Sequence, residues 1–246
     1  MSFGIDIAET DWRMRIAIIP ARGGSKRIPN KNIRDFLGRP MICWSIETAQ
    51  KSGMFDHVVV STDSESIAEV AQTSGAIVPF IRPSELSDDH TPVREVINHA
   101  IRESNKSLGE FNYCCCIFAT APLLQTTDLE IAFEILMNSS SNFVFSAAEY
   151  DFPIQRAFYK TSNGIEMFFP EHTKTRSQDL VKSFHDAGMF YWGKTSAFLN
   201  REPMFSGLSI PYVLPSHRVC DIDDMDDWQR AQWLMKVMQT ESVQHG

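Results

Sequence analysis

Residues 15–32 read RIAIIPARGGSKRIPNKN, a short apolar run that leads into a loop rich in glycine, lysine and arginine. The run Arg15–Ile19 has the length and the β-branched content of a buried strand, and Pro20 ends it. Next, Pro40–Lys51 carries apolar residues at helical spacing and is followed by the helix stop Gly53. A strand, a loop and a helix in this order predict the first unit of an α/β fold.

The same alternation continues along the chain. Further strands are expected at His57–Ser61, Ala76–Phe80, Asn112–Phe118 and Asn142–Ala147, and helices at Ser64–Ser74, Pro92–Ser104 and Thr127–Met137, the last capped by Thr126 or Thr127. The strands are continuously apolar rather than half polar, which is typical of a parallel sheet with helices on both faces. The fold class predicted is therefore α/β and doubly wound.

The rhythm breaks at about residues 150–182, where aromatic residues, prolines and charges mix without a helical period and only Ile165–Phe169 resembles a strand. We expect an insertion here that acts as a small lid or a dimerisation segment. Strands resume at Gly188–Trp192 and Ser209–Leu214, and a helix follows over Asp223–Met238. The domain organisation expected is a flexible extension over 1–13, a single domain over 14–238 and a flexible tail over 239–246.

Charge and cysteine content exclude several classes of protein. The 31 acidic and 23 basic residues give a net charge of −8, so the molecule as a whole repels nucleic acid and anionic membranes. The longest apolar run, Cys114–Leu124, is about half the ~20 residues that a membrane-spanning helix needs. Five cysteines without a C-x-x-C pair favour a reducing, cytoplasmic location. Cys114, Cys115 and Cys116 alternate between the two faces of a strand, so we expect small core residues rather than a metal site.

The loop after the first strand concentrates positive charge. Five basic residues and no acidic residue lie between Arg22 and Arg34. Gly23 and Gly24 let backbone N–H groups approach an anion, and Ser25 adds a hydroxyl donor. The pattern favours a polyphosphate-binding loop over a solvated basic turn. It matches neither the Walker A pattern nor G-x-G-x-x-G, which argues against ATPases and dinucleotide-dependent dehydrogenases.

An acidic segment stands near the other end of the chain. Asp221 and Asp223 project to the same face of an extended segment, and two carboxylates on one side suit a Mg²⁺ ion that also binds phosphates. An ordinary helix cap explains this pair equally well. Acidic residues at positions 224, 226 and 227 fall in the first turn of the last helix, where capping and the helix dipole favour them.

Several motifs together resemble one known family. These are IIPARGGSKRIPNKN (18–32), VVVSTDS (58–64), IRPSELSDD (81–89), ATAPLL (119–124) and CDIDDMDDW (220–228). In this order they resemble the cytidylyltransferases that activate nonulosonic acids, the acylneuraminate cytidylyltransferase family, over Met14 to about Met238. FPIQRAF (152–158) and FHDAGMFYWG (184–193) are most similar to the branch that acts on pseudaminic acid. Phe118 and Leu124 stand where sialic acid synthetases usually carry Gln and Arg, which argues against sialic acid itself.

The resemblance implies a Rossmann-like sheet, a homodimer formed partly through the insertion, and the reaction of CTP with a nonulosonic acid to give a CMP-sugar and pyrophosphate. Mg²⁺ is the implied cofactor. The nucleotide-binding residues implied are Ala21, Arg22, Gly23, Gly24, Ser25, Lys31, Asn32, Arg82, Asp89 and Thr120. Asp221 and Asp223 are the implied metal ligands, and with Arg22 and Lys31 they form the catalytic set. Candidate sugar-binding residues are Gln155, Arg156, Arg176, Gln178 and Tyr191.

Some alternatives remain open at this point. The exposed Arg and Gln side chains of an insertion also suit a dimer interface. His172, His185 and His217 have no nucleophile paired with them, so we assign no general base. A sister enzyme that acts on legionaminic or N-acetylneuraminic acid, and a nucleotide-binding regulator without turnover, are the rival functions.

Overall fold

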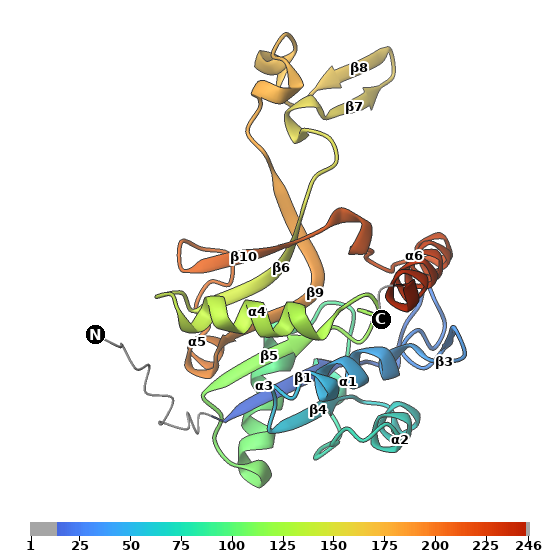
Figure 1. The fold of residues 1–246 in the computed structure, drawn as a ribbon, viewed down its shortest axis with the longest axis vertical. Helices are drawn as coiled ribbons and strands as arrows, with labels where there is room; N and C mark the ends of the chain where they lie inside the picture. The colour runs from blue at the N-terminus through green and yellow to red at the C-terminus, as the bar shows by residue number, and fades with distance from the viewer. Residues whose placement is uncertain (1–13, 245–246) are drawn as a thin grey trace.

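The structure is a computed structural model that describes residues 14–244, so the extension expected at 1–13 and the last two residues of the expected tail lie outside the described residues. Its centre is a six-stranded sheet with the strand order β10-β6-β9-β5-β1-β4 (Figure 1). The elements are β1 (Arg15–Pro20), β2 (Asp35–Phe36), β3 (Arg39–Pro40), α1 (Met41–Lys51), β4 (His57–Ser61), α2 (Glu65–Thr73), α3 (Val93–Leu108), β5 (Tyr113–Ile117), α4 (Thr126–Met137), β6 (Phe143–Glu149), β7 (Phe158–Thr161), β8 (Gly164–Met167), β9 (Phe184–Lys194), α5 (Thr195–Leu199), β10 (Ser209–Leu214) and α6 (Met225–Gln244).

The sheet is mostly parallel, as predicted. Strand β1 runs parallel to both β4 and β5, and β10 runs parallel to β6. The exception is β9, which lies antiparallel between β5 and β6 and is longer than the strand expected at Gly188–Trp192. The carboxyl ends of β1, β4 and β5 therefore meet at one edge of the sheet, where ligands bind in folds of this class.

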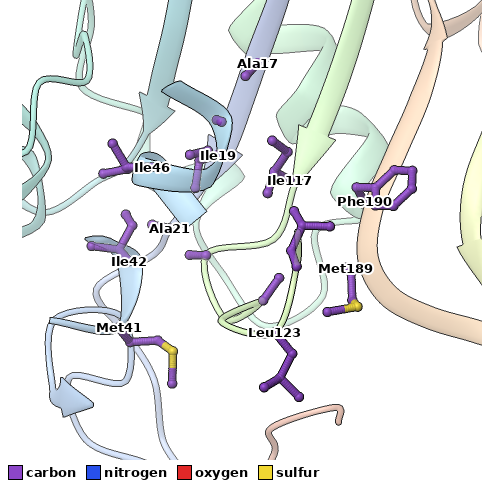
Figure 2. Packing of buried hydrophobic residues seen from close by; sticks show 14 of the residues in the cluster. Ala17, Ile19, Ala21, Met41, Ile42, Ile46, Ile117, Leu123, Met189 and Phe190 are labelled. Atoms are coloured by element: carbon purple, nitrogen blue, oxygen red, sulfur yellow. The ribbon is translucent and has the colours of Figure 1, made fainter. Parts of the chain in front are cut away.

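Alternate residues of the central strands face two separate apolar layers. Ala17 and Ile19 pack into the layer formed with α1, α2, α4 and α6, and Figure 2 shows part of this layer around Ile42, Ile117 and Phe190. Ile16 and Ile18 pack into the opposite layer, which includes α3 and α5. The three adjacent cysteines follow the same alternation, with Cys115 on one side and Cys114 and Cys116 on the other, and all three side chains are fully buried. The prediction of core cysteines is confirmed.

Three local predictions differ from the structure. Residues 76–80 do not form a strand. Ile77 makes an isolated bridge to Val59 of β4 and Ile81 makes one to Thr62, because Pro79 has no N–H with which to continue a ladder between them. Helix α4 starts at Thr126 rather than Thr127, and neither threonine caps it: the carboxylate of Asp128 accepts the backbone N–H of Gln125 at 2.9 Å.

Helix α6 was expected to end at Met238, but it continues to Gln244, so residues 239–244 are helical rather than the start of a tail. Within the described residues no helix has the length and the apolar character that crossing a membrane requires.

The chain between β6 and β9 leaves the sheet and forms a projecting arm, residues 150–183 (Figure 1). The arm contains the antiparallel hairpin β7–β8, of which the sequence predicted only the second strand. Large apolar side chains that are exposed on the arm are Tyr150, Phe152, Phe158, Tyr159, Ile165, Phe168, Phe169 and Val181. An arm with so many exposed apolar side chains fits association with another protein surface better than a free loop does.

Candidate functional site

A cleft of about 600 Å³ lies at the carboxyl ends of β1 and β5. The loop after β1 supplies its basic side, the segment between β4 and α3 supplies a second side, and residues 118–120 after β5 close the third. Of the residues predicted to bind nucleotide or metal, the cleft is lined by Arg22, Ser25, Lys31, Asn32, Arg82, Asp89, Thr120 and Asp223. Gly23 and Gly24 lie in the same loop but do not line the cleft, and Ala21 is buried at its base.

Two basic side chains of the loop share one carboxylate. Arg22 and Lys26 each form an ion pair with Asp89, which lies in the segment between β4 and α3. Hydrogen bonds from Lys26 and Arg22 lower the pKa of Asp89 to about 2, so the carboxylate stays ionised at neutral pH. Asp89 was predicted to be a nucleotide-binding residue; here its carboxylate is paired with Arg22, a side chain predicted to hold phosphate.

The basic loop also meets the acidic segment from the other end of the chain. The Lys31 ammonium donates to the carbonyl oxygen of Ile222 at 2.6 Å, and Arg27 forms an ion pair with Asp223 at 2.7 Å. Burial lowers the pKa of Lys31, while the charges of Asp223 and Asp221 oppose this effect. The two charge clusters that the sequence places about 190 residues apart are therefore brought into one site, as predicted.

Asn32 fixes the shape of the basic loop. Its side-chain amide donates to the carbonyl oxygen of Arg22 at 2.9 Å, and its own carbonyl accepts the N–H of Ile42 in α1 at 2.8 Å. The side chain is buried, so the bond is shielded from competing water. Asn32 thus ties the start of the loop to its end and to the first helix.

The two carboxylates of the acidic segment open onto different cavities. Asp223 lines the cleft, whereas Asp221 lines a second cavity of about 620 Å³. Burial and the nearby charge of Asp223 raise the pKa of Asp221, while the charges of Lys31 and Arg27 oppose this effect. Carboxylate oxygens are hard donors that suit Mg²⁺, which proteins commonly hold with one or two carboxylates and substrate phosphates. No group of three or more His, Cys, Asp or Glu side chains suited to a metal occurs among residues 14–244.

The remaining acidic residues of this segment cap helix α6. Asp224 accepts the backbone N–H groups of Asp226 and Asp227 at 2.9 and 3.0 Å, and Asp227 accepts those of Asp223 and Asp224 at 3.1 and 3.2 Å. The expectation that the acidic run after Asp223 serves the helix start is confirmed.

The structure does not bring the candidate sugar-binding residues to the cleft of the same chain. Gln155, Arg156, Arg176 and Gln178 belong to the projecting arm and line neither cavity. Gln155 and Arg156 instead donate to backbone carbonyl groups within the arm. The insertion was predicted to form a small lid over the site, but in this chain its hairpin extends away from the sheet (Figure 1).

Tyr191, expected as a wall of the sugar site, is buried beneath the cleft. Its ring packs edge to face against Phe118 at 5.3 Å, and its hydroxyl group donates to Asp186. Phe118 lines the first cavity and Asp186 lines the second. Tyr191 therefore supports one residue of each cavity from below, rather than forming a wall itself.

Two residues at the site, Asp63 and Phe118, were not among the predicted binding residues. Asp63, which follows β4, and Phe118, which follows β5, both lie beyond the carboxyl ends of central strands. Position at a strand end is the signal that could have identified them, because the edge formed by these ends carries the site.

Comparisons with known proteins agree with this geometry. The family model described as cytidylyltransferase matches residues 16–222. The pseudaminic acid cytidylyltransferase of Campylobacter jejuni (strain 81-176) is 48% identical over 223 residues, which cover 90% of this chain and 96% of the relative. The CMP-N,N'-diacetyllegionaminic acid synthase of Legionella pneumophila is 37% identical over 236 residues, covering 92% and 98% of the two chains.

Among solved structures, a CMP:2-keto-3-deoxy-manno-octonic acid synthetase complexed with CTP aligns with a TM-score of 0.68 at 15% identity, covering 92% of this chain and 99% of that one. At this identity the likeness concerns the fold alone. The family match spans the basic loop and ends at Ile222, between Asp221 and Asp223. The chain belongs to the cytidylyltransferase family.

Proposed function

We propose that the protein transfers CMP from CTP to the anomeric hydroxyl group of pseudaminic acid and releases pyrophosphate, as a cytoplasmic enzyme of surface glycan synthesis. The single observation that carries the proposal is the meeting of the basic loop with Asp221 and Asp223 at the carboxyl edge of the sheet. The choice of acceptor rests on the 48% identity to pseudaminic acid cytidylyltransferase over nearly the whole chain.

The triphosphate of CTP is assigned to the basic side of the cleft. Arg22 offers a planar guanidinium for two phosphate oxygens, and Lys31 offers a point charge. In the reaction the acceptor oxygen forms a bond to the α-phosphorus while the bond to pyrophosphate breaks. Such transfers need positioning and cancellation of negative charge more than covalent help from the protein. Arg22 and Lys31 supply both.

Asp221 and Asp223 are the proposed ligands of Mg²⁺. A bound Mg²⁺ neutralises phosphate charge and polarises the phosphoryl oxygens. Arg27 contacts Oδ1 of Asp223, which leaves the other carboxylate oxygen for the ion that this residue would hold. Arg27 also lines the cleft, where it would face an anionic ligand.

We assign the acceptor to the second cavity, which Asp221 shares. Its lining combines the aromatic side chains of Tyr150 and Phe152 with polar groups of His185, Asp186, His217 and Arg230. Arg230 suits the acceptor's carboxylate, and the aromatic side suits its less polar face. This placement replaces Gln155, Arg156, Arg176 and Gln178 as the acceptor site within one chain.

We further propose a homodimer formed through the arm. The side chains of Phe158 on β7 and Ile165 on β8 are 53% and 59% exposed, although both are large and apolar. They lie on the same face of the hairpin, since Phe158 pairs with Met167 and Lys160 pairs with Ile165. An apolar face on a projecting hairpin is suited to a second copy of the chain, and Arg176 and Gln178 then serve that interface.

The test of the proposed activity is a reaction with CTP, MgCl₂ and pseudaminic acid, scored by pyrophosphate release and by the mass of the nucleotide product. Formation of the CMP-sugar supports the enzyme. Binding of CTP in calorimetry without pyrophosphate release, across pseudaminic, legionaminic and N-acetylneuraminic acids, would instead support a regulator without turnover.

A further inference from the structure

Asp63, which follows strand β4, holds two parts of the nucleotide cleft from behind without lining it. Its Oδ1 accepts the backbone N–H of Gly23 at 2.9 Å. The same oxygen lies 3.6 Å from a terminal nitrogen of Arg82. One carboxylate oxygen therefore contacts both the glycine turn of the basic loop and the guanidinium on the opposite side of the cleft.

Gly23 is held tightly at this contact. A Cβ atom at this position would lie 3.1 Å from the Cβ of Ser64, closer than most such contacts, whereas a Cβ at the neighbouring Gly24 would meet nothing within 4 Å. Two residues earlier, Ala21 donates its N–H to the carbonyl oxygen of Ser61 at 2.9 Å. The turn of the basic loop is thus fastened to the end of β4, and Asp63 makes the side-chain part of that attachment.

Arg82 depends on Asp63 for charge compensation. Its side chain is only 3% exposed yet lines the cleft, and its Nε donates to the Ser87 hydroxyl group at 3.0 Å. Burial lowers the pKa of Arg82, and the charge of Asp63 is the largest opposing effect. A buried guanidinium that loses such a partner is strongly destabilised. Asp63 therefore favours the conformation in which Arg82 reaches the cleft.

We infer that Asp63 is a positioning residue for the nucleotide: it sets the distance between the turn at Gly23 and the guanidinium of Arg82, and thereby the fit of CTP. The inference rests on the proposed function of the cleft. Asp63 acts before the chemical step and on one substrate only. Its loss should raise the KM for CTP while the KM for the acceptor and the kcat at saturating CTP change little.

Two substitutions separate the two contacts. Asp63→Asn keeps an oxygen for the Gly23 N–H and removes the charge that faces Arg82, whereas Asp63→Ala removes both. Because hydrogen bonds to charged groups are worth more than neutral ones, we expect Asp63→Ala to raise the KM for CTP about tenfold and Asp63→Asn to fall between it and the unchanged protein.

Asp56→Asn is the matched control. Asp56 precedes β4, and its Oδ2 accepts the N–H of Arg15 at 2.6 Å, the same type of contact at the far end of the same strand pair. Its substitution should leave both KM values unchanged. Thermal unfolding of all variants shows whether they are folded, and kinetics on the folded fraction exclude a simple loss of active protein.

Equal KM values for CTP in Asp63→Asn, Asp63→Ala and Asp56→Asn would overturn the inference. So would an equal loss of kcat in the two Asp63 variants with the KM values for CTP and for the acceptor unchanged. If the wild-type protein forms no CMP-sugar from any acceptor, that result contradicts the proposed function instead. In that case the effect of Asp63 on CTP affinity is still measured by calorimetry, so the two failures are distinguishable.

Discussion

Asp89 is paired with Arg22 in the cleft, and the same carboxylate also binds Lys26. A triphosphate that uses Arg22 has to displace this carboxylate or bind beside a like charge. Neutralising Asp89 should therefore favour the nucleotide. We expect Asp89→Asn to lower the Kd for CTP several-fold in calorimetry without an acceptor.

Asp88→Asn is the control for Asp89→Asn. It removes the same charge one position away, where the carboxylate binds the N–H groups of His90 and Thr91 rather than a basic side chain. A similar gain of affinity in both variants would assign the effect to net charge alone. Weaker CTP binding in Asp89→Asn would show that Asp89 holds the nucleotide itself.

The ion pairs of Asp89 should survive mild acid. The pKa of this carboxylate is lowered to about 2, so its interactions are present above the usual value near 4 and are lost only as the pH falls through the lowered value. The difference in CTP affinity between the wild-type protein and Asp89→Asn should thus still be close to its neutral-pH value at about pH 4. A difference that is about half lost near pH 4 would mean that the carboxylate titrates in its ordinary range.

Lys31→Ala should reduce kcat/KM by the equivalent of about 2–4 kcal/mol, the effect of removing one preorganised charge partner from a transition state. Lys31 is half-buried, and its ammonium group donates to the carbonyl oxygen of Ile222 at 2.6 Å. Lys26→Ala is the comparison, because the Lys26 side chain is 82% exposed and should matter little. Near-normal turnover in the pyrophosphate-release assay of Lys31→Ala would exclude this role.

Asp223→Asn should raise the Mg²⁺ concentration that gives half-maximal activity. A neutral amide is a weaker ligand for a hard cation than a carboxylate. Asp226→Asn, a change of equal charge in the first turn of α6, should leave the Mg²⁺ dependence as it is. Activity titrations with MgCl₂ compare the two variants, and equal titration curves would count against Asp223 as a ligand.

Phe158→Asp combined with Ile165→Asp should convert the proposed dimer into a monomer, since both side chains lie on the exposed face of the hairpin. Val237→Asp, at a 57% exposed position on α6, is the control and should not change the mass. Light scattering after size-exclusion chromatography gives the mass directly. If the wild-type protein is a monomer, or if the double variant remains a dimer, the arm is not the dimer interface.

Two strands match the expected ranges to the residue, since their apolar runs end at clear boundaries. These are β4, which is buried over nearly its whole length, and β10, of which only Leu214 is buried. The direction of β9 was not predictable, because an antiparallel strand buried on both faces has the same apolar pattern as a parallel one. Residues 76–80 misled for a related reason: their apolar content suits a strand, but Pro79 prevents the ladder.

The site was predictable where one local motif carries it. The basic loop is one contiguous segment, and Asp221 and Asp223 lie in another. The charge pattern of each segment is therefore visible in the sequence. Asp63 and Phe118 lie at the site because the strands that precede them end at the same edge of the sheet. The predicted sugar-binding residues of the arm lie outside the cleft, because the hairpin extends away from the sheet. Contacts between segments that lie far apart in the sequence are not visible in local patterns.

A competition between acceptors tests most directly whether the protein is specific for pseudaminic acid. Equal concentrations of pseudaminic, legionaminic and N-acetylneuraminic acids are offered together with limiting CTP and MgCl₂, and the CMP-sugars are separated and identified by mass spectrometry. We expect CMP-pseudaminic acid to be the dominant product. Dominance of either other CMP-sugar, or its formation at an equal rate, would contradict the proposed preference for pseudaminic acid.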